Sequence, residues 1–363
     1  MENKGIVNSR AYQLIEPEKF EEVILQHAVN NDQVVVQPSL ASICHADMRY
    51  YTGQRRKEAL QRKLPMALFH EGIGHVVKSK DGSLAKGQRV VMVPNIPARR
   101  LKDNTIDDNP SSNRRVVKDN YLPDSVFLGS GYDGIGQQYL VLPTENVIPI
   151  PDHVPDEIAV LAELTSVSLH AASHVSGYLC CGKVAVFGDG PVGYLTAATL
   201  HHVFDIPKEN LLVFGAIRER LAHFDFAITH LVHDFNFREE EDVVAVMECT
   251  GGAFSKNAIN QAIDLIEPQG KITLMGVSEE HVPLNTRDVL EKGLTICGSS
   301  RSTDEEFKTL MNAFQSQAYQ RTLAKLLPDQ NERIRNVKDL QRAMNKATKN
   351  KDWGKIFLSF EWD

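Results

Sequence analysis

The spacing of apolar residues changes near Pro151, and the change separates two kinds of pattern along the chain. Before Pro151 the apolar runs are short and are interrupted by glycine, proline and aspartate. Such runs are typical of strands in a barrel-like β domain, because the interrupting residues favour turns. The strands expected in this part are Val34–Val36, Gly74–Val77, Arg89–Val93 and Tyr139–Leu142.

After Pro151 the sequence alternates strand-like apolar runs with amphipathic segments. This alternation predicts a parallel sheet covered on both faces, and six strands suit a doubly wound nucleotide-binding fold. Between the fourth and fifth strands, apolar residues recur at helical spacing over Ile259–Ile266, and Pro268 and Gly270 follow as helix-ending residues. The six expected strands are Val184–Phe187, Leu211–Phe214, His230–His233, Val243–Met247, Lys271–Met275 and Leu294–Cys297.

The part beyond Arg301 is predicted to be helical and to end in a strand that packs back on the first domain. Phe307–Phe314 places apolar residues on one helical face, and Ile356–Phe360 is a short apolar run. We therefore expect an α/β protein. A β-rich domain would comprise residues 1–150, completed by residues 302–363, and a doubly wound parallel-sheet domain would comprise residues 151–301.

Size and composition favour a globular protein with two cores over a short binding module, since the chain has 363 residues of which 42% are hydrophobic. The formal net charge of −7 arises from 47 acidic and 40 basic side chains, without a basic tract that would bind a nucleic acid. Met1–Arg10 does not resemble a signal peptide, and no run of about 18 apolar residues follows. We expect a cytoplasmic protein that binds neither nucleic acid nor a membrane.

One polar stretch, residues 95–125, is longer than most connections in compact domains. It is basic at Arg99–Arg100 and at Arg114–Arg115, and it has almost no apolar periodicity. Two interpretations remain open from the sequence: a surface excursion or subunit contact, and a lobe that covers the substrate.

A glycine-rich sequence directly follows the first strand of the expected parallel sheet. Gly188 would make the tight turn, Gly190 would let the backbone approach a pyrophosphate, and Gly193 would allow close packing of the following helix. The unpaired N–H groups at the helix start would then bind the pyrophosphate. A chance glycine-rich turn is the alternative, and the location between a strand and a helix argues against it.

The end of the second strand indicates which dinucleotide binds. An Asp or Glu there would accept hydrogen bonds from the adenosine ribose of NAD(H), but Val213–Arg218 contains no acid. Arg218 and Arg220 would instead donate charge-assisted hydrogen bonds to the 2′-phosphate of NADPH, worth about 1.5–3 kcal/mol each. Solvated charges at a helix start are the alternative interpretation. The expected cofactor contacts also include Val192, Thr250 and Ser278.

Candidate metal ligands lie in three separate segments. The five cysteines are odd in number and irregularly spaced, which argues against a disulfide framework and leaves a thiolate available as a ligand. Cys44, the pair His70 and Glu71, and Glu163 offer thiolate, imidazole and carboxylate groups, a donor set that suits tetrahedral zinc. Each residue alone has a simpler explanation, as a core cysteine or as part of a surface pair.

Taken together, the motifs resemble those of the medium-chain alcohol and polyol dehydrogenases. The chain carries Cys-x-x-Asp from residue 44, His-Glu-Gly-x-Gly from residue 70 and Gly-x-Gly-x-x-Gly from residue 188, in the family's order and at about its spacing. The resemblance spans nearly the whole chain. It implies a GroES-like catalytic domain, a Rossmann domain and an active site in the cleft between them.

The resemblance also implies roles for individual residues. Cys44 and His70 would be zinc ligands, and either Glu71 or Glu163 would complete the shell, so that one coordination position exchanges between water and substrate. Asp47 would accept a hydrogen bond from the His70 ring and fix its tautomer.

Two departures from the family pattern change these expectations. Ala46 stands where many relatives have Ser or Thr as a proton relay, so protons would move through water, Glu71, Glu163 or His45. The four-cysteine structural zinc lobe of many relatives would lie in residues 95–125, which contain no cysteine. One zinc ion per subunit is therefore expected.

Residues 47–55, 290–294 and 298–302 resemble the bacterial ribulose-5-phosphate reductases, also called ribitol-5-phosphate dehydrogenases. That resemblance implies NADPH-dependent reduction of D-ribulose 5-phosphate to D-ribitol 5-phosphate, which supplies CDP-ribitol for wall teichoic acid. The expected substrate contacts are Arg49, Tyr50 and Arg301, and arginine can bind phosphate through two hydrogen bonds. An ion pair at the surface or at a subunit interface is the alternative for each arginine. A homodimer and an association with a ribitol-5-phosphate cytidylyltransferase are further expectations.

Two other functions remain open. One is a dehydrogenase of an unphosphorylated polyol such as sorbitol or xylitol. The other is a catalytically silent dinucleotide-binding relative, against which the set of Cys44, His70 and Glu71 argues.

Overall fold

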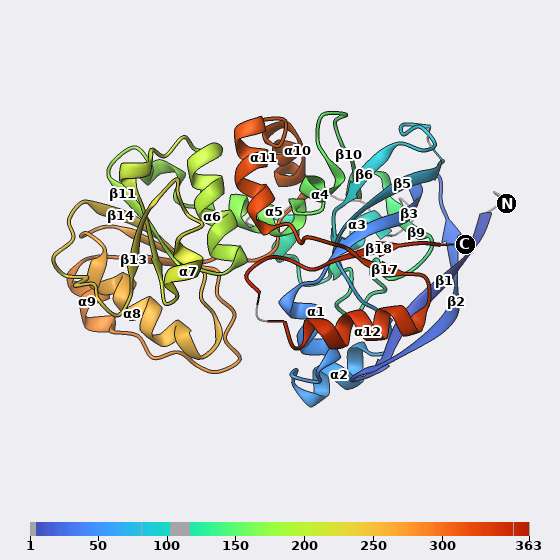
Figure 1. Cartoon of the computed structure of the whole chain (residues 1–363), viewed down its shortest axis with the longest axis horizontal. Coiled ribbons are helices and arrows are strands. Elements are labelled where there is room, and N and C mark those ends of the chain that lie inside the picture. The colour runs from blue at the N-terminus through green and yellow to red at the C-terminus, as the bar shows by residue number, and fades with distance from the viewer. Residues whose placement is uncertain (1–4, 81, 102–116, 351, 363) are drawn as a thin grey trace, which may run out of the picture. The chain divides into compact units, whose positions relative to one another are not determined.

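The computed structural model describes residues 5–80, 82–101, 117–350 and 352–362 of the chain, which divides into two compact units (Figure 1). Unit 1 comprises residues 1–163, 302–315 and 327–363, and unit 2 comprises residues 164–301 and 316–326. These units differ from the expected domain ranges at two places: residues 151–163 belong to unit 1, and Ser316–Leu326 belongs to unit 2.

Unit 1 is built on a seven-stranded sheet in which β18 (Phe357–Phe360) pairs antiparallel with β3 (Gln33–Ser42), so the end of the chain lies beside an early strand. The strand order is β10-β6-β5-β3-β18-β17, with β9 also paired to β3. The four strands expected before Pro151 are confirmed as β3, β5, β6 and β9, although Val93 and Tyr139 fall just outside β6 and β9. The other strands of the sheet are β5 (Glu71–Ser79), β6 (Arg89–Met92), β9 (Leu140–Pro143), β10 (Val147–Pro149) and β17 (Glu332–Ile334).

A twisted ribbon of β1 (Gly5–Glu16) and β2 (Lys19–Val29), extended by β4 (Met66–Ala67), forms a second sheet that the sequence did not predict. One face of the ribbon is open to solvent, and even apolar residues on it are exposed, with Ile6 at 67% and Ile24 at 63%. Charged and apolar residues are therefore mixed along β2, and no apolar run marks it as a strand.

The helices of unit 1 include α1 (His45–Tyr51), α2 (Lys57–Lys63) and α12 (Val337–Ala347), and α12 contacts both α1 and β2. This packing buries Tyr51 and Leu340 and fixes α1, which follows directly from the end of β3. The remaining elements of unit 1 are β7 (Asn95–Ile96), α3 (Ala98–Leu101), the short 3₁₀ helices η1 (Asp119–Tyr121) and η2 (Thr144–Asn146), β8 (Val126–Phe127), α4 (Asp156–Ala159) and α10 (Asp304–Ala313).

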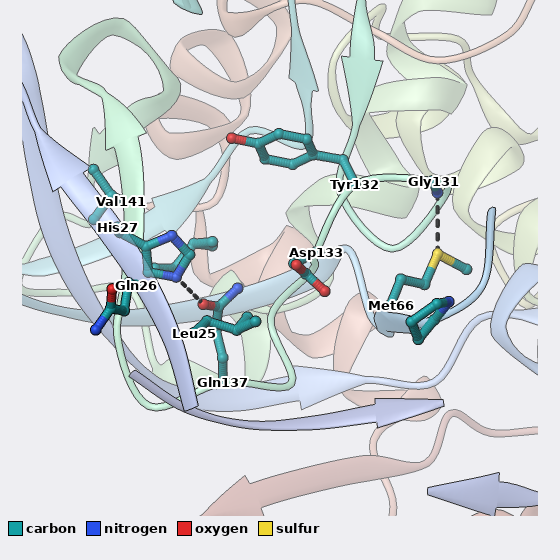
Figure 2. Close-up of a pocket in the computed structure, with 11 residues that line it drawn as sticks. Leu25, Gln26, His27, Met66, Gly131, Tyr132, Asp133, Gln137 and Val141 are labelled. Atoms are coloured by element: carbon teal, nitrogen blue, oxygen red, sulfur yellow. Dashed lines mark hydrogen bonds between the residues drawn. The ribbon is translucent and has the colours of Figure 1, made fainter. Parts of the chain in front are cut away.

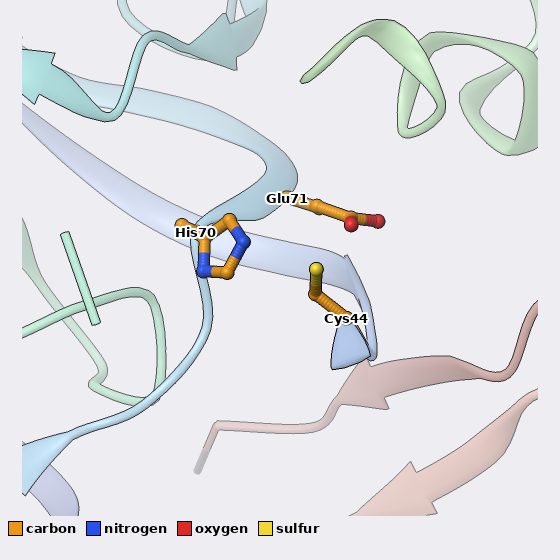
Figure 3. A group of neighbouring side chains, drawn as sticks. All are labelled: Cys44, His70 and Glu71. Carbon is orange, nitrogen blue, oxygen red and sulfur yellow. The ribbon is translucent and has the colours of Figure 1, made fainter. Parts of the chain in front are cut away.

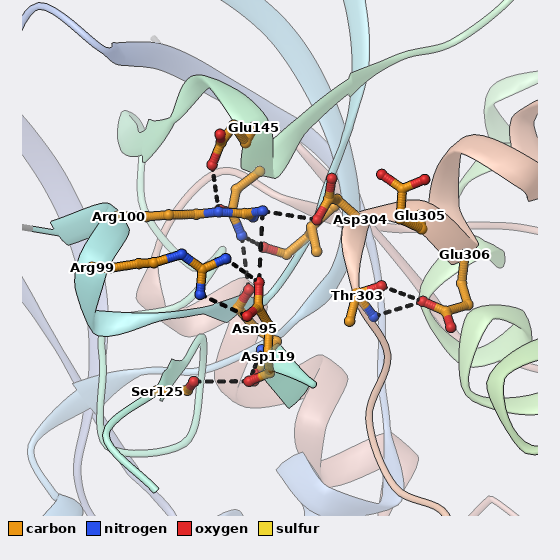
Figure 4. A network of polar contacts seen from close by, with 12 residues as sticks. Asn95, Arg99, Arg100, Asp119, Ser125, Glu145, Thr303, Asp304, Glu305 and Glu306 are labelled. Atoms are coloured by element: carbon orange, nitrogen blue, oxygen red, sulfur yellow. Dashed lines mark hydrogen bonds and ion pairs between the residues drawn. The ribbon is translucent and has the colours of Figure 1, made fainter. Parts of the chain in front are cut away.

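Residues on both sides of the segment 102–116 are joined by ion pairs (Figure 4). The Arg99 guanidinium donates two hydrogen bonds of 2.6 Å to the Asp119 carboxylate. Arg100 pairs with Glu145 and, at 2.9 Å, with Asp304 at the start of α10. The expectations for Arg114 and Arg115, and for most of the 95–125 stretch, lie outside the described residues.

Unit 2 contains a six-stranded, wholly parallel sheet in the order β13-β12-β11-β14-β15-β16. This order confirms the expected doubly wound fold, in which the chain starts at a central strand and builds outward on both sides. The third strand begins and ends earlier than expected, at Ile228 and Leu231. The strands are β11 (Lys183–Phe187), β12 (Leu211–Gly215), β13 (Ile228–Leu231), β14 (Val243–Glu248), β15 (Lys271–Leu274) and β16 (Thr295–Gly298).

Helix α11 (Gln317–Leu323) packs on α6 (Pro191–His202) within unit 2. Buried hydroxyl groups join the two helices, since Tyr319 and Thr199 share a hydrogen bond of 3.0 Å and Tyr194 donates to the Thr322 carbonyl at 2.8 Å. The other helices are α5 (Ala162–Ser173), which begins in unit 1, then η3 (Ser176–Tyr178), η4 (Lys208–Asn210), α7 (Arg218–Leu221), η5 (Gly252–Phe254), α8 (Ser255–Leu265), α9 (Thr286–Glu291) and η6 (Ala324–Leu326). Among the described residues, no helix combines the length and the apolar character that crossing a membrane requires.

Candidate functional site

Three of the residues expected to bind a metal lie together where β3 ends and β5 begins (Figure 3). Ser42, the last residue of β3, pairs in register with Glu71, the first residue of β5. Cys44 follows β3 as the N-cap of α1, and His70 directly precedes β5. Antiparallel pairing of two strands thus brings together side chains that are far apart in the sequence.

The ligand atoms of Cys44, His70 and Glu71 all lie within 4.8 Å of one another. His70 is 5% exposed and Glu71 is fully buried. Thiolate, imidazole and carboxylate donors in this arrangement suit a tetrahedral zinc site. The donor chemistry and the burial of the cluster therefore fit one zinc ion.

The charges in this cluster act strongly on each other. Burial raises the pKa of the Cys44 thiol. Burial opposes protonation of His70, but the negative charges of Asp47 and Cys44 outweigh it and raise the His70 pKa well above its usual value. Because metal ligands must be deprotonated, binding of a cation to these groups would release protons and would depend on pH.

Asp47 is fully buried and accepts hydrogen bonds from two backbone N–H groups, that of Cys44 at 2.9 Å and that of Phe69 at 3.2 Å. These bonds tie the backbone of one candidate ligand to the residue that precedes the other. The Nδ1 atom of His70 is 3.7 Å from an Asp47 oxygen, which exceeds hydrogen-bond length. The contact between Asp47 and the His70 ring is therefore electrostatic in this structure.

Lys355 is a buried residue of the site that the sequence did not reveal. Its Nζ atom lies 2.8 Å from a Glu71 oxygen and donates a hydrogen bond of 3.0 Å to the Ile43 carbonyl. Burial opposes ionisation of Glu71, but the charge of Lys355 lowers the Glu71 pKa, so the pair is ionised. In the sequence, Lys355 is a single lysine directly before the apolar run that forms β18, and nothing around it indicates a partner.

Glu163, in the first turn of α5, is 4% exposed. It is not one of the three residues whose ligand atoms lie within 4.8 Å, although its charge acts on His70. Burial and the negative charge of Glu71 raise the Glu163 pKa to about 7, against the opposing charges of His70 and Lys355. The two candidate carboxylates thus differ, with Glu71 ionised beside Lys355 and Glu163 near its midpoint at neutral pH.

In unit 2 the glycine-rich turn joins β11 to α6, and its three glycines serve different purposes. Gly188 has a φ of +134°, which side chains rarely adopt. A Cβ atom on Gly193 would lie 2.0 Å from the Gly188 carbonyl oxygen, so the fold itself requires this glycine. A Cβ atom on Gly190, the N-cap of α6, would meet nothing within 4 Å. The open space at Gly190 is therefore available to a ligand at the helix N-terminus.

The two candidate arginines differ in their surroundings. Arg218, the first residue of α7, is exposed, whereas an Arg220 nitrogen is 3.5 Å from an oxygen of Asp189. Asp189 also accepts hydrogen bonds from the backbone N–H groups of Ala216 at 2.7 Å and Ile217 at 2.9 Å. This aspartate from the glycine-rich turn thus fixes the turn that presents both arginines.

The other expected cofactor contacts lie at the same end of the sheet. Val192 is in the first turn of α6, and Thr250 and Ser278 follow the carboxyl ends of β14 and β15. Thr250 donates a backbone hydrogen bond of 2.9 Å to Glu248, and the Ser278 hydroxyl donates one of 3.0 Å to the Glu280 carbonyl. Ligands of doubly wound sheets bind at this edge.

The expected substrate residues fall in both units. Arg49 and Tyr50 lie on α1, and Tyr50 is only 1% exposed, with its hydroxyl group 3.0 Å from Lys63 Nζ and 3.1 Å from Ser130 Oγ. Arg301 follows β16 in unit 2, and its φ of +58° is in the left-handed region. Burial lowers the pKa of Arg301.

Unit 1 also has a surface pocket of about 320 Å³ beside β2 and the loop that follows β8 (Figure 2). His27 and Gln137 share a hydrogen bond of 2.7 Å in its wall. The pocket is lined by none of the residues proposed from the sequence as site residues. The pocket is therefore separate from the cluster of Cys44, His70 and Glu71.

Two family models match the chain. The alcohol dehydrogenase GroES-like domain matches residues 30–152, and the zinc-binding dehydrogenase model matches residues 223–316. Together with the parallel sheet of unit 2, these matches confirm the expected combination of a GroES-like domain and a Rossmann domain.

Relatives with assigned activities match nearly the full length. Ribulose-5-phosphate reductase 1 of Staphylococcus aureus is 38% identical, over 97% of this chain and 99% of the relative. Ribulose-5-phosphate reductase of Bacillus spizizenii is 34% identical, with the same coverage of each chain. The crystal structure of S. aureus TarJ in complex with NADPH superposes with a TM-score of 0.80 at 34% identity, covering 98% of this chain and 100% of that one.

Proposed function

Because the chain belongs to the zinc-binding alcohol dehydrogenases and, among them, to the ribulose-5-phosphate reductases, we propose that it reduces D-ribulose 5-phosphate to D-ribitol 5-phosphate with NADPH. The observation that carries this proposal is the cluster of half-buried Cys44 with buried His70 and Glu71, in a chain that matches these reductases over 97% of its length. A ketone is reduced by hydride addition to its carbon and protonation of its oxygen, and the cluster lies in a water-poor environment suited to that change of charge.

Cys44 and His70 would hold the zinc ion, with Glu71 or Glu163 as the third protein ligand. A bound zinc ion supplies Lewis-acid polarisation of the ketone oxygen. Asp47 fixes the backbone on both sides of the cluster through its bonds to Cys44 and Phe69. Ala46 offers no hydroxyl group, so the proton for the product oxygen comes from another group or from water.

For NADPH, the pyrophosphate would bind at the N-terminus of α6, where Gly190 leaves open space. Arg218, with Arg220 beside it, would bind the 2′-phosphate. Further contacts would come from Val192, Thr250 and Ser278, which lie at the same edge of the sheet. The TarJ complex with NADPH, at 34% identity, supports this choice of cofactor.

On the substrate side, Arg49, Tyr50 and Arg301 remain the proposed contacts. The product would supply CDP-ribitol for wall teichoic acid in the cytoplasm. A homodimer and an association with a ribitol-5-phosphate cytidylyltransferase belong to the same proposal.

The test is to follow loss of NADPH by the purified protein with ribulose 5-phosphate, and in parallel with ribulose, fructose and xylulose 5-phosphate. We expect kcat/KM for ribulose 5-phosphate to exceed that for ribulose at least about tenfold, since one charge-assisted contact accounts for that much. One zinc ion per chain and loss of activity with a chelator are also expected. Equal rates on ribulose and its phosphate would indicate a polyol dehydrogenase, and absence of both zinc and turnover would indicate a silent relative.

A further inference from the structure

A second polar group of unit 1 includes Tyr50 on α1, the helix that Cys44 caps, and the proposed function uses no other member of it. Lys63, the last residue of α2, donates hydrogen bonds to the Tyr50 hydroxyl at 3.0 Å and to the Ser130 hydroxyl at 2.9 Å. The two hydroxyl groups are themselves 3.1 Å apart. We call Lys63, Tyr50 and Ser130 the lysine–hydroxyl group.

Positive charge is concentrated at this group. The Arg55 guanidinium carbon is 4.7 Å from the centre of the Tyr50 ring, and Lys63 Nζ is 5.7 Å from the same centre. Among the described residues, no carboxylate forms an ion pair with Lys63. Asp133, the acid of the Ser130 loop, instead accepts hydrogen bonds from Gln13 and from the Ala67 backbone.

Hydrogen-bond donors remain available at the lysine–hydroxyl group. An ammonium group has three N–H donors, and within the described part of the chain Lys63 uses two of them. Both hydroxyl groups accept from Lys63, so each keeps its own proton, and only one of these protons is used in the bond between them. One N–H group and one O–H group can therefore be donated to an anion.

The Ser130 loop is held rigidly by its backbone. Gly129 and Gly131 have φ values of +64° and +89°, and a Cβ atom on Gly131 would lie 3.2 Å from Lys63 Cγ. The Gly131 N–H group donates to Met66 Sδ at 3.0 Å (Figure 2). A little earlier in the chain, Phe127 packs against the His70 ring at 5.3 Å. The loop is thus fixed relative to a candidate metal ligand.

The lysine–hydroxyl group and the candidate metal ligands are carried by the same elements of unit 1. Cys44 is the N-cap of α1 and Tyr50 is the sixth residue of that helix. In a pentulose 5-phosphate, the carbonyl carbon and the phosphorus are five bonds apart, or about 6 Å when extended. Such a substrate therefore needs a phosphate site on elements that neighbour those of the metal ligands.

On the basis of the proposed function, we propose that Lys63 and Ser130 bind the phosphate of the substrate, next to the expected substrate contact Tyr50, whose hydroxyl group bonds to both. Arg55 adds a second cation beside the same ring. The Tyr50 hydroxyl accepts from Lys63 and contacts Ser130, so it fixes these two side chains relative to each other, and the phosphate takes the remaining donors.

The experiment compares Lys63→Met with wild type by measuring kcat/KM for ribulose 5-phosphate and for ribulose at saturating NADPH. Methionine keeps much of the stem and removes the charge. We expect the ratio of the two kcat/KM values to fall at least about tenfold, mainly through KM for the phosphorylated substrate. Competitive inhibition by inorganic phosphate should weaken in parallel, and Lys63→Arg should retain part of both properties. Lys57→Met, on the exposed start of the same helix, is the matched control.

The outcomes separate this inference from the proposed function. If wild type prefers ribulose 5-phosphate and Lys63→Met leaves the ratio unchanged, or if activity on both substrates falls in parallel, the phosphate assignment is wrong and the function stands. If wild type itself does not turn over ribulose 5-phosphate, the proposed function fails. If Lys63→Met does not fold, Ser130→Ala gives the same test. The ratio of the two kcat/KM values should then fall by a smaller factor.

Discussion

The candidate metal site of unit 1 is formed by side chains, whereas the nucleotide-binding turn of unit 2 is formed by the backbone. Cys44, His70 and Glu71 each bring a polar group into a buried region, and neighbours such as Lys355 must balance their charges. Gly190 and Gly193 contribute only the absence of a side chain. The first site therefore depends on charge balance and the second on space, and substitutions should affect them in different ways.

The largest effect is expected from Cys44→Ala, which removes a metal ligand. The variant should lose its zinc, and kcat/KM for ribulose 5-phosphate should fall about 10³-fold or more, because the metal supplies several kcal/mol of charge stabilisation. NADPH affinity, a property of the backbone turn, should be unchanged. Metal analysis and NADPH fluorescence titration measure the two quantities, with exposed Cys180→Ala as the control. Full activity without zinc would remove the metal from the mechanism.

A smaller effect, on stability, is expected from Lys355→Met. Without Lys355, the fully buried Glu71 carboxylate has no counter-charge. This should lower the unfolding free energy of the zinc-free protein by about 3–5 kcal/mol. The loss should be smaller in the zinc-loaded protein, since a metal cation offsets the same carboxylate. Urea unfolding of both forms, with the exposed Lys338→Met as control, tests this. An equal loss in both forms would contradict the charge-balance argument.

In the turn, Gly193→Ala and Gly190→Ala should differ in kind. The first places a methyl group 2.0 Å from a backbone oxygen and should destabilise unit 2 by about 3 kcal/mol. The second fills space that is empty in the free protein, so the melting temperature should stay the same while the NADPH dissociation constant rises. Thermal unfolding and NADPH titration distinguish the two. Equal destabilisation by both would mean that the open space at Gly190 is not reserved for a ligand.

The smallest change is expected at the arginines, where side chains rather than backbone determine the choice of dinucleotide. Arg218→Gln should lower the ratio of kcat/KM for NADPH to that for NADH about tenfold, the effect of one charge-assisted contact. Arg220→Gln should change it less, because Asp189 already lies 3.5 Å from this guanidinium group. If Arg220→Gln lowered this ratio more than Arg218→Gln did, Arg220 and not Arg218 would be the main contact of the 2′-phosphate.

The sequence predicted most of unit 2, because strands and helices there repeat over short distances and all six parallel strands were found. The resemblance to the medium-chain dehydrogenases also implied a shared site for Cys44 and His70 with either Glu71 or Glu163, and the structure groups Glu71 with the first two. The sequence did not predict the β1–β2 ribbon, whose solvent-facing side mixes charged and apolar residues. Lys355 could not be predicted from local pattern, since its partner Glu71 is 284 residues away and the pair forms only when β18 joins β3.

The paired arginines of α3 have a consequence for how this part of unit 1 responds to salt. Arg99 and Arg100 hold Asp119, Glu145 and Asp304. These ion pairs are partly exposed, whereas Lys355 and Glu71 are buried, and dissolved ions screen exposed charges more than buried ones. Concentrated salt should therefore loosen the elements that border positions 102–116 before it affects the buried pair beside the candidate ligands.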